Sequence, residues 1–344
     1  MPERVVALTR DVRSLTDQAI VDIQALLART RILALNAKIE AARAGEAGQA
    51  FGVVAGEVNE VSTRISDLAA ALGADLAERT GELERLGTNL VEQVRGTRLA
   101  DLALNAIETV DRNLFERTAD VRWWATDSAF VSVCATPTAD AVAHASRRLG
   151  VILSSYTVYL DLWVCDLDGQ VLATGRPDRF GQAVGADVSR EPWFLDARAT
   201  RTGDDYAVAD VREERLLDGA RTATYAAAIR TDGDPRGEII GVLGIHFDWD
   251  PLANGVLQGL RMDADERART RCLLIDADNR IIASADGHGV LTETVTLPAD
   301  VADVGHELGR DGVVLGYALT PGYETYAGLG WRGLLIQQPV RTSS

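Results

Sequence analysis

The feature that most constrains this chain is a pair of apolar repeats on either side of a short stretch that contains glycine. After that stretch, apolar side chains recur in steps of three and four, at Phe51, Val54, Val58, Val61, Ile65, Leu68 and Leu72, and again at Leu83, Leu86, Leu90 and Val94. Before it, the same steps pass through Ile20, Ile23, Leu27, Thr30, Ala34, Ala37 and Ala41. This is the heptad pattern of helices that pack along a common seam.

The stretch ARAGEAGQA between the two repeats predicts a reversal of the chain. Gly45 and Gly48 can release a helix into a turn because glycine adopts backbone angles that other residues avoid. We therefore expect an antiparallel helical hairpin over residues 1–96, with its tip near 45–48. The heptads carry few of the flanking charges that restrict pairing, so we expect a homodimer in which two hairpins form a coiled-coil four-helix bundle.

The next segment also has a helical period. No proline interrupts it before Pro137, and apolar residues from Leu99 to Val121 share one face. The pattern predicts one long connecting helix over residues 97–147. The adjacent Trp123 and Trp124 are interpreted as packing residues, in the core or in a dimer contact.

The remaining chain changes to the period of β-strands and contains an internal duplication. WVCDLDGQVLATG and LLIDADNRIIASA share one plan, in which two apolar runs flank a turn that follows an Asp-x-Asp triplet. Further apolar runs follow at 222–230 and 238–247, and a helical stretch at 250–262. We expect two similar modules, at 148–254 and 255–344, which gives an α+β fold class.

Composition and spacing exclude several functions. The net charge of -16 disfavours nucleic acid and anionic membrane surfaces. The three cysteines are far apart, and the four histidines form no ligand pair, so we expect no metal and no cofactor. No apolar run approaches the ~20 residues of a membrane helix, which predicts a cytoplasmic protein without membrane insertion.

The sequence also lacks the signatures of catalysis. It has no glycine-rich phosphate loop, no metal-ligand set and no nucleophile elbow. A chance acid/base grouping of Glu191, His246 and Asp248 is the one enzymatic alternative. We therefore predict that the protein is not an enzyme and has no catalytic residues.

The segment LALNAKIEAARAGEAGQAFGVVAGEV resembles the signalling hairpin of methyl-accepting chemotaxis proteins. The resemblance covers about the first 95 residues and departs from the family at Arg29-Thr30-Arg31 and at Gln49-Ala50. It implies partners, namely a chemotaxis histidine kinase and its coupling adaptor, or other chemoreceptors. The residues it implies for these contacts are Ile32, Leu35, Glu40, Arg43, Glu46 and Val53. Clear glutamate pairs of the methylation type are absent.

The rest of the chain resembles a double Cache sensor domain, in which a long helix precedes two PAS-like modules. The matching phrases include LWVCDLDGQVLATG, DVSREPWFLDA, ATYAAAIR and GEIIGVLGIHFDW. The resemblance implies a pocket for a small polar ligand in the first module. The candidate ligand-binding residues are Arg190, Trp193, Phe194, Tyr206, Asp210, Tyr225, Arg230, His246 and Asp248.

This pocket departs from the amino-acid-binding pattern of the family at three positions. Glu191 replaces the usual arginine, Phe194 replaces a tyrosine, and His246 stands where a late-strand aspartate is usual. Because alternate residues of a strand share a face, His246 and Asp248 are expected to point inward together. Trp193 and His246 have a simpler interpretation as core residues. The three departures favour a small polar ligand other than an amino acid, such as an amine, a purine or an organic acid.

Two functional hypotheses follow. The first is a chemoreceptor-like sensor, in which ligand binding shifts the long helix and so the hairpin tip. The second is a ligand-free scaffold whose hairpin inserts among chemoreceptors. A polar, open pocket would favour the sensor, and an apolar, filled one the scaffold.

Overall fold

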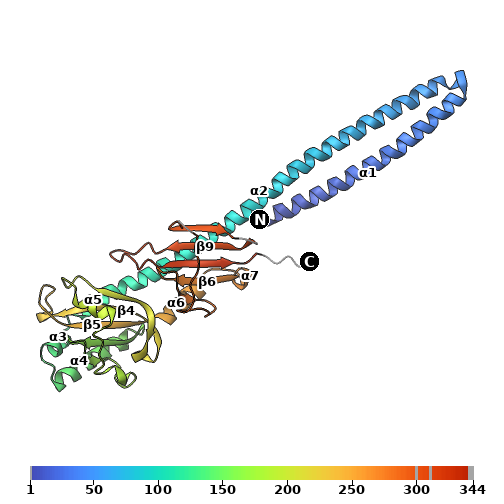
Figure 1. Cartoon of the computed structure of the whole chain (residues 1–344). Coiled ribbons are helices and arrows are strands. Elements are labelled where there is room, and N and C mark those ends of the chain that lie inside the picture. Colours follow the sequence, from blue (N-terminus) through green and yellow to red (C-terminus); the bar gives the residue numbers. More distant parts are fainter. Residues whose placement is uncertain (1, 299–300, 310–311, 340–344) are drawn as a thin grey trace. The chain divides into compact units, whose positions relative to one another are not determined.

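A computed structural model describes residues 2–298, 301–309 and 312–339 of the chain. The chain divides into two compact units, Met1–Arg95 and Gly96–Ser344. Helices make up the first unit, and the second contains two five-stranded antiparallel sheets (Figure 1). The predicted α+β class, with a helical part followed by two sheet modules, is therefore confirmed.

The first unit is a helical hairpin. Helix α1 (Pro2–Arg43) and the beginning of α2 (Gln49–Trp124) are joined by a single 3-10 turn, η1 (Gly45–Gly48). Gly45 adopts a φ of 62°, which favours glycine. A Cβ atom on Gly48 would lie 2.1 Å from the Ala41 carbonyl oxygen, so the arms meet closely only because this residue has no side chain.

The seam inside the hairpin matches the predicted one at Leu27, Ala34 and Ala41 and differs from it at most other positions. Mostly small side chains form it at intervals of seven residues, and its buried positions include Leu27, Ala34, Ala41, Gly48, Ala55, Ser62 and Ala69. Most large apolar residues of the predicted seam are exposed instead, and Phe51 and Leu68 are 74% and 69% exposed. The reason is steric, because small residues let the two arms approach closely and leave the larger side chains on the outer faces.

The single helix predicted over 97–147 is wrong. Helix α2 ends at Trp124, and two further helices follow, α3 (Ser128–Ala135) and α4 (Ala139–Ser155). Each begins at a capping side chain, since Asp127 accepts a hydrogen bond from the Ala129 N–H (2.9 Å) and Thr138 one from the Ala141 N–H (3.2 Å). These caps satisfy amide groups that a new helix start leaves free, and they mark the breaks.

The two adjacent tryptophans have different environments. Trp124 is buried, and its ring packs edge-on against Tyr156 and Tyr159 at centroid distances of 5.0 and 5.5 Å. Trp123 is 69% exposed. The packing interpretation therefore holds for Trp124 alone.

The first sheet has the strand order β2-β1-β5-β4-β3. The strands are β1 (Tyr159–Cys165), β2 (Val171–Thr174), β3 (Ala207–Glu214), β4 (Ala220–Arg230) and β5 (Ile239–Asp248). One face packs against α2, α3 and α4, and helix α5 (Pro192–Arg198) packs against the other. Short 3-10 turns occur at η2 (Gly181–Ala183), η3 (Arg215–Leu217) and η4 (Thr231–Gly233).

The second sheet repeats this order as β7-β6-β10-β9-β8. Its strands are β6 (Thr270–Ile275), β7 (Ile281–Ser284), β8 (Val304–Leu308), β9 (Val314–Leu319) and β10 (Arg332–Gln337). Helices α6 (Trp249–Gly259) and α7 (Ala264–Ala268) connect the modules. The edge strand β8 was not predicted from the sequence.

The duplicated Asp-x-Asp stretches form equivalent turns. Asp166 accepts hydrogen bonds from the backbone N–H groups of Asp168 (3.0 Å) and Gln170 (2.8 Å). Asp276 accepts the corresponding pair from Asp278 and Arg280 at 3.0 and 2.8 Å. The same carboxylate geometry closes both hairpins, which explains why the motif occurs twice.

Candidate functional site

The predicted ligand-binding residues divide between the two faces of the first sheet. Trp193, Phe194 and His246 lie on the face that α5 covers, in one buried cluster or in ring contact with it. Tyr225 packs on the opposite face with α2. The structure therefore does not bring the predicted set into one pocket, and the α5 face holds the stronger candidate site.

His246 of β5 lies at the centre of this face. Its ring centroid is 3.8 Å from that of Trp163 and 5.7 Å from that of Trp193. Its Nδ1 atom is 3.1 Å from the Thr224 hydroxyl. Its Nε2 atom is buried and has no hydrogen-bond partner among the described residues, and the same holds for Trp193 Nε1. Buried polar atoms without partners are uncommon and point to a bound group.

Arg212 belongs to this site although the sequence reasoning missed it. It pairs in register with Thr222, which pairs in turn with Asp248, so the three residues form a row across β3, β4 and β5. The Arg212 Nη2 atom lies 2.5 Å from a Glu191 carboxylate oxygen and 3.2 Å from one of Glu214. Its Nε atom is buried without a partner in the described structure.

The available sequence signal for Arg212 was the charged end of a strand-like stretch. The stretch AVADVREE begins with three apolar residues and ends in an arginine beside two acids. The register of β3 against β4 shifts between Ala209 and Arg212. Such an irregularity re-aims a side chain and is not visible in the sequence period.

Asp161 of β1 fixes the position of the Trp163 ring in the site. One oxygen of its carboxylate accepts hydrogen bonds from the backbone N–H groups of Leu162 (2.8 Å), Gly175 (3.0 Å) and Arg176 (3.0 Å). The other accepts one from Trp163 Nε1 at 3.1 Å. This carboxylate therefore fixes the Trp163 ring that packs on His246.

Burial sets the protonation states of the site. It lowers the pKa of His246 to about 3, and the nearby positive charge of Arg212 acts in the same direction. Burial raises the pKa of Asp161 to about 6, although its four N–H donors favour the charged form. The pKa of Asp248 is raised by burial and by Asp250. At neutral pH the site therefore presents a neutral imidazole beside a guanidinium group.

The low pKa of His246 predicts a pH dependence of stability. Below about pH 6.5 the unfolded chain binds a proton at this residue that the folded chain does not bind. The free energy of unfolding should therefore fall by about 1.4 kcal/mol per pH unit between pH 6.5 and pH 3 from this residue alone.

Asp161 has the opposite effect on the free energy of unfolding below about pH 6, because its pKa is raised in the folded chain. Comparing the wild type with a variant that lacks His246 separates the two effects. Urea unfolding of the wild type and of His246→Gln at a series of pH values gives the difference between the two proteins. We expect that difference to be constant above about pH 7 and to change steadily on acidification. A constant difference throughout would mean that His246 has its ordinary pKa.

Of the other predicted residues, Tyr206 lies beside Tyr225 and Asp210 lies towards the second module. The rings of Tyr206 and Tyr225 have a centroid distance of 6.3 Å, and the Tyr225 hydroxyl donates to that of Tyr326 at 3.5 Å. The pKa of Asp210 is raised by burial, which the positive charge of Arg280 opposes. These residues line the region where the two modules meet.

Arg230 and Arg190 have roles outside the α5-face cluster. Arg230 donates to the carbonyl oxygens of Gly237 (2.9 Å) and Thr200 (3.0 Å), and so holds two loops together. Arg190 is exposed near Asp187. Neither guanidinium reaches His246 through any contact that the structure describes.

The residues predicted for partner contacts lie at and near the turn of the hairpin. The apolar side chains Ile32, Leu35 and Val53 are 60%, 58% and 63% exposed. Arg43 and Glu40 form an ion pair of 2.7 Å one helical step apart. Glu46 is exposed within η1. Exposed apolar residues grouped in this way are typical of contact surfaces.

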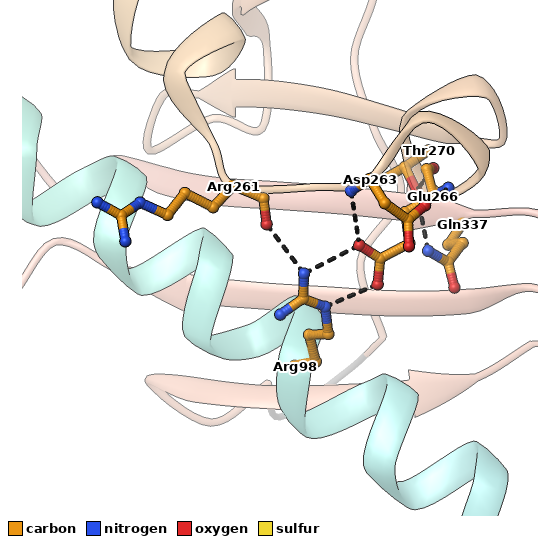
Figure 2. A network of polar contacts seen from close by, with 6 residues as sticks. All are labelled: Arg98, Arg261, Asp263, Glu266, Thr270 and Gln337. Atoms are coloured by element: carbon orange, nitrogen blue, oxygen red, sulfur yellow. Dashed lines mark hydrogen bonds and ion pairs between the residues drawn. The ribbon is translucent and has the colours of Figure 1, made fainter. Parts of the chain in front are cut away.

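The second module holds α2 through polar and close-packed contacts. Figure 2 shows Arg98 of α2 donating to both carboxylate oxygens of Glu266, at 2.7 and 2.9 Å, and to the Arg261 carbonyl oxygen at 2.9 Å. Further along α2, the buried Asp111 accepts hydrogen bonds from the Thr320 hydroxyl and from the Gly322 N–H (2.9 Å). This part of α2 is therefore fixed to the module at two points.

The described residues give no sign of a membrane helix or a metal centre. None of the helices within them has an apolar stretch long enough to cross a bilayer. The same residues contain no group of three or more His, Cys, Asp or Glu side chains arranged to hold a metal ion.

Comparisons with known proteins give two kinds of match. A family model described as the methyl-accepting chemotaxis protein (MCP) signalling domain matches residues 4–148. Methyl-accepting chemotaxis protein I of Escherichia coli is 36% identical over 113 residues, which are 32% of this chain and 20% of that protein. The methyl-accepting chemotaxis aspartate transducer of Klebsiella aerogenes is 37% identical over 89 residues, or 26% and 16%.

The chain thus spans a fifth or less of the length of these relatives. Both relatives are described as methyl-accepting chemotaxis proteins or transducers, and neither description names an enzymatic activity.

Solved structures identify the fold of the second unit. The sensory domain of the Campylobacter jejuni chemoreceptor Tlp3 (CcmL) has a TM-score of 0.52 at 16% identity, over 70% of this chain and 92% of that one. The ligand-binding domain of the Pseudomonas aeruginosa amino acid chemoreceptor PctC, in complex with GABA, gives the same score and identity over 70% and 99%. The chain therefore joins a segment similar to the methyl-accepting chemotaxis protein signalling domain to a unit with the Cache fold of chemoreceptor sensory domains.

Proposed function

We propose that this protein is a chemoreceptor-like sensor whose first module binds a small molecule that carries a carboxylate. The observation that supports this most directly is the group of unpartnered buried polar atoms on the α5 face, at Arg212 Nε, His246 Nε2, Trp193 Nε1 and Thr222 Oγ1. A guanidinium group and ring N–H groups are donors, and a carboxylate is their natural acceptor. The fold that this unit shares with the ligand-binding domain of PctC, an amino acid chemoreceptor, is consistent with this class of ligand.

The relay in this proposal is helix α2. It is one continuous helix from Gln49 to Trp124, so it belongs to the hairpin and to the sensor unit. Both modules pack against it, the first through its apolar face and the second through Arg98 and Asp111. A ligand that binds one arrangement of the modules more tightly would shift the position of α2, and with it the hairpin tip.

The output surface in this proposal is the hairpin tip. A histidine kinase and its coupling adaptor, or neighbouring chemoreceptors, would contact the exposed apolar residues Ile32, Leu35 and Val53. The larger apolar residues on the outer faces of the arms would be covered in a homodimer. Two hairpins would then form the four-helix bundle that the heptads predict.

A thermal-shift measurement of the full chain with single L-amino acids tests the ligand. A compound at a hundred times its Kd should add about 2.7 kcal/mol to the free energy of unfolding. We expect Arg212→Gln to abolish the shift, because the guanidinium is the charged donor. The exposed Arg236→Gln in the same module serves as the matched control and should keep it.

The same measurement can favour the alternative function, a ligand-free scaffold that inserts its hairpin among chemoreceptors. The observation behind this alternative is that Trp163, Trp193 and Phe194 fill the α5 face and are fully buried. No shift with any compound, together with capture of a chemotaxis kinase or receptor that is lost in Glu46→Ala, would support the scaffold. A shift that survives in Arg212→Gln would reject the proposed site.

A further inference from the structure

We propose that the second module contains a separate binding site for a small dianion, formed around Arg267 and Arg269. The site is a cleft of about 460 Å³ beside α7, where β6 begins and β10 ends. The stretch ERARTRC supplies its arginines at alternate positions, 267, 269 and 271. A cleft of this volume is large enough for a small-molecule ligand.

The charges that line the cleft are mainly positive. Arg271 is paired, because its Nε atom lies 3.0 Å from an Asp286 carboxylate oxygen. Arg267 and Arg269 instead donate to the backbone carbonyl oxygens of Leu260 and Gln338. Among the described residues, no carboxylate lies within ion-pair distance of either. Neither guanidinium therefore forms an ion pair within the described residues, in a protein whose net charge is -16.

The rest of the lining suits a compact ligand with an apolar body. Cys272 and Ile336 contribute apolar surface, and Thr270 contributes a hydroxyl. Burial raises the pKa of Cys272 to about 11, so its thiol is neutral near pH 7 and adds no negative charge. Guanidinium groups bind carboxylates and phosphates through paired N–H donors. A short dicarboxylate and inorganic phosphate share this chemistry.

A residue that lines the cleft also contacts Glu266, which attaches α2 to the module. Thr270, which lines the cleft, donates to the Glu266 carbonyl oxygen at 2.6 Å and accepts from Gln337 Nε2 at 3.0 Å. Figure 2 shows that Glu266 is also the residue that holds Arg98 of α2. A dianion in the cleft would thus lie beside the segment that connects this module to α2.

Isothermal titration calorimetry of the full chain with succinate and, separately, inorganic phosphate tests the site at matched ionic strength. We expect saturable binding of at least one of them, with an affinity about tenfold lower in Arg269→Gln and no detectable binding when Arg267→Gln is added. Arg236→Gln, an exposed arginine of the first module, should bind as the wild type does. Competition between the probes shows whether a dicarboxylate or a phosphate fits better.

Three results would overturn the site. These are no saturable binding of either probe up to about 10 mM, equal binding by Arg269→Gln and the wild type, or loss of binding in Arg212→Gln. The last result would place the anion in the first module and would leave the function proposed above intact. If the double variant does not fold, Arg269→Gln alone decides the question. This single variant should fold, because the Arg269 side chain donates only one hydrogen bond, to a single backbone carbonyl.

Discussion

Replacing Gly333 by alanine is expected to lower the free energy of unfolding of the second unit, residues 96–344, by about 3 kcal/mol or more. Gly333 lies in β10 directly under α2, and an added Cβ atom would be 2.3 Å from the Ala103 carbonyl oxygen and 3.0 Å from its carbonyl carbon. Both contacts are with backbone, which cannot rotate away as a side chain could. Relief therefore requires α2 to move off the sheet. The melting temperature should fall by roughly 6–12 °C.

Gly255→Ala is the matched control for this substitution. Gly255 lies within α6, and a Cβ atom there would meet nothing within 4 Å. Alanine is favoured over glycine in a helix, so this variant should gain about 0.5–1 kcal/mol. Equal stabilities of Gly333→Ala and the wild type in urea unfolding would contradict the close packing of α2 on the second sheet. Gly316→Ala should behave like Gly333→Ala, since its Cβ would lie 2.4 Å from that of Leu99.

Asp161→Ala is expected to be the most damaging substitution at the candidate site, with a loss of about 3–5 kcal/mol in the free energy of unfolding. The carboxylate is fully buried and accepts four N–H hydrogen bonds. Alanine would leave all four donors buried without a partner, at a cost of about 1–3 kcal/mol for each donor that water cannot reach. The Trp163 ring would also lose the bond that fixes it beside His246.

Two further variants separate this effect from a general loss of charge. Asp161→Asn keeps a carbonyl oxygen for the three backbone donors but sets an NH₂ group against Trp163 Nε1, so we expect a loss of about 1–2 kcal/mol. Asp196→Ala removes an exposed carboxylate of α5 and should change stability by less than about 0.5 kcal/mol. Denaturant unfolding followed by tryptophan fluorescence measures all three. Equal losses in the alanine and asparagine variants would show that the four-bond geometry is not the cause.

Local signals in the sequence were sufficient for the hairpin and for the two sheet modules. Heptad spacing on both sides of Gly45 and Gly48 predicted the hairpin, since the period of a helix and the special angles of glycine are properties of neighbouring residues. The repeated Asp-x-Asp turns predicted two alike modules for the same reason. The helix over 97–147 failed because the caps at Asp127 and Thr138 are single side chains within an apolar period that otherwise continues.

Which apolar residues face the interior of the hairpin depended on the packing of the two arms. The heptad steps placed Ala34 and Ala41 in the seam before the turn, but they placed Phe51 and Leu68 in the seam after it, because larger side chains bury more apolar area. In the structure the small residues form the seam and the large ones are exposed. A close approach between helices needs small side chains, and that distance is a property of the pair of helices rather than of either one.

The candidate site shows the same division between sequence and structure. The sequence by itself placed Trp193, His246 and Asp248 in one module. Only the tertiary structure separated Tyr225 from this group, because β4 sends successive side chains to opposite faces of the sheet. It alone brought Arg212 into the row with Thr222 and Asp248, because the register of three strands and the irregularity in β3 are set by pairing between segments far apart in the chain.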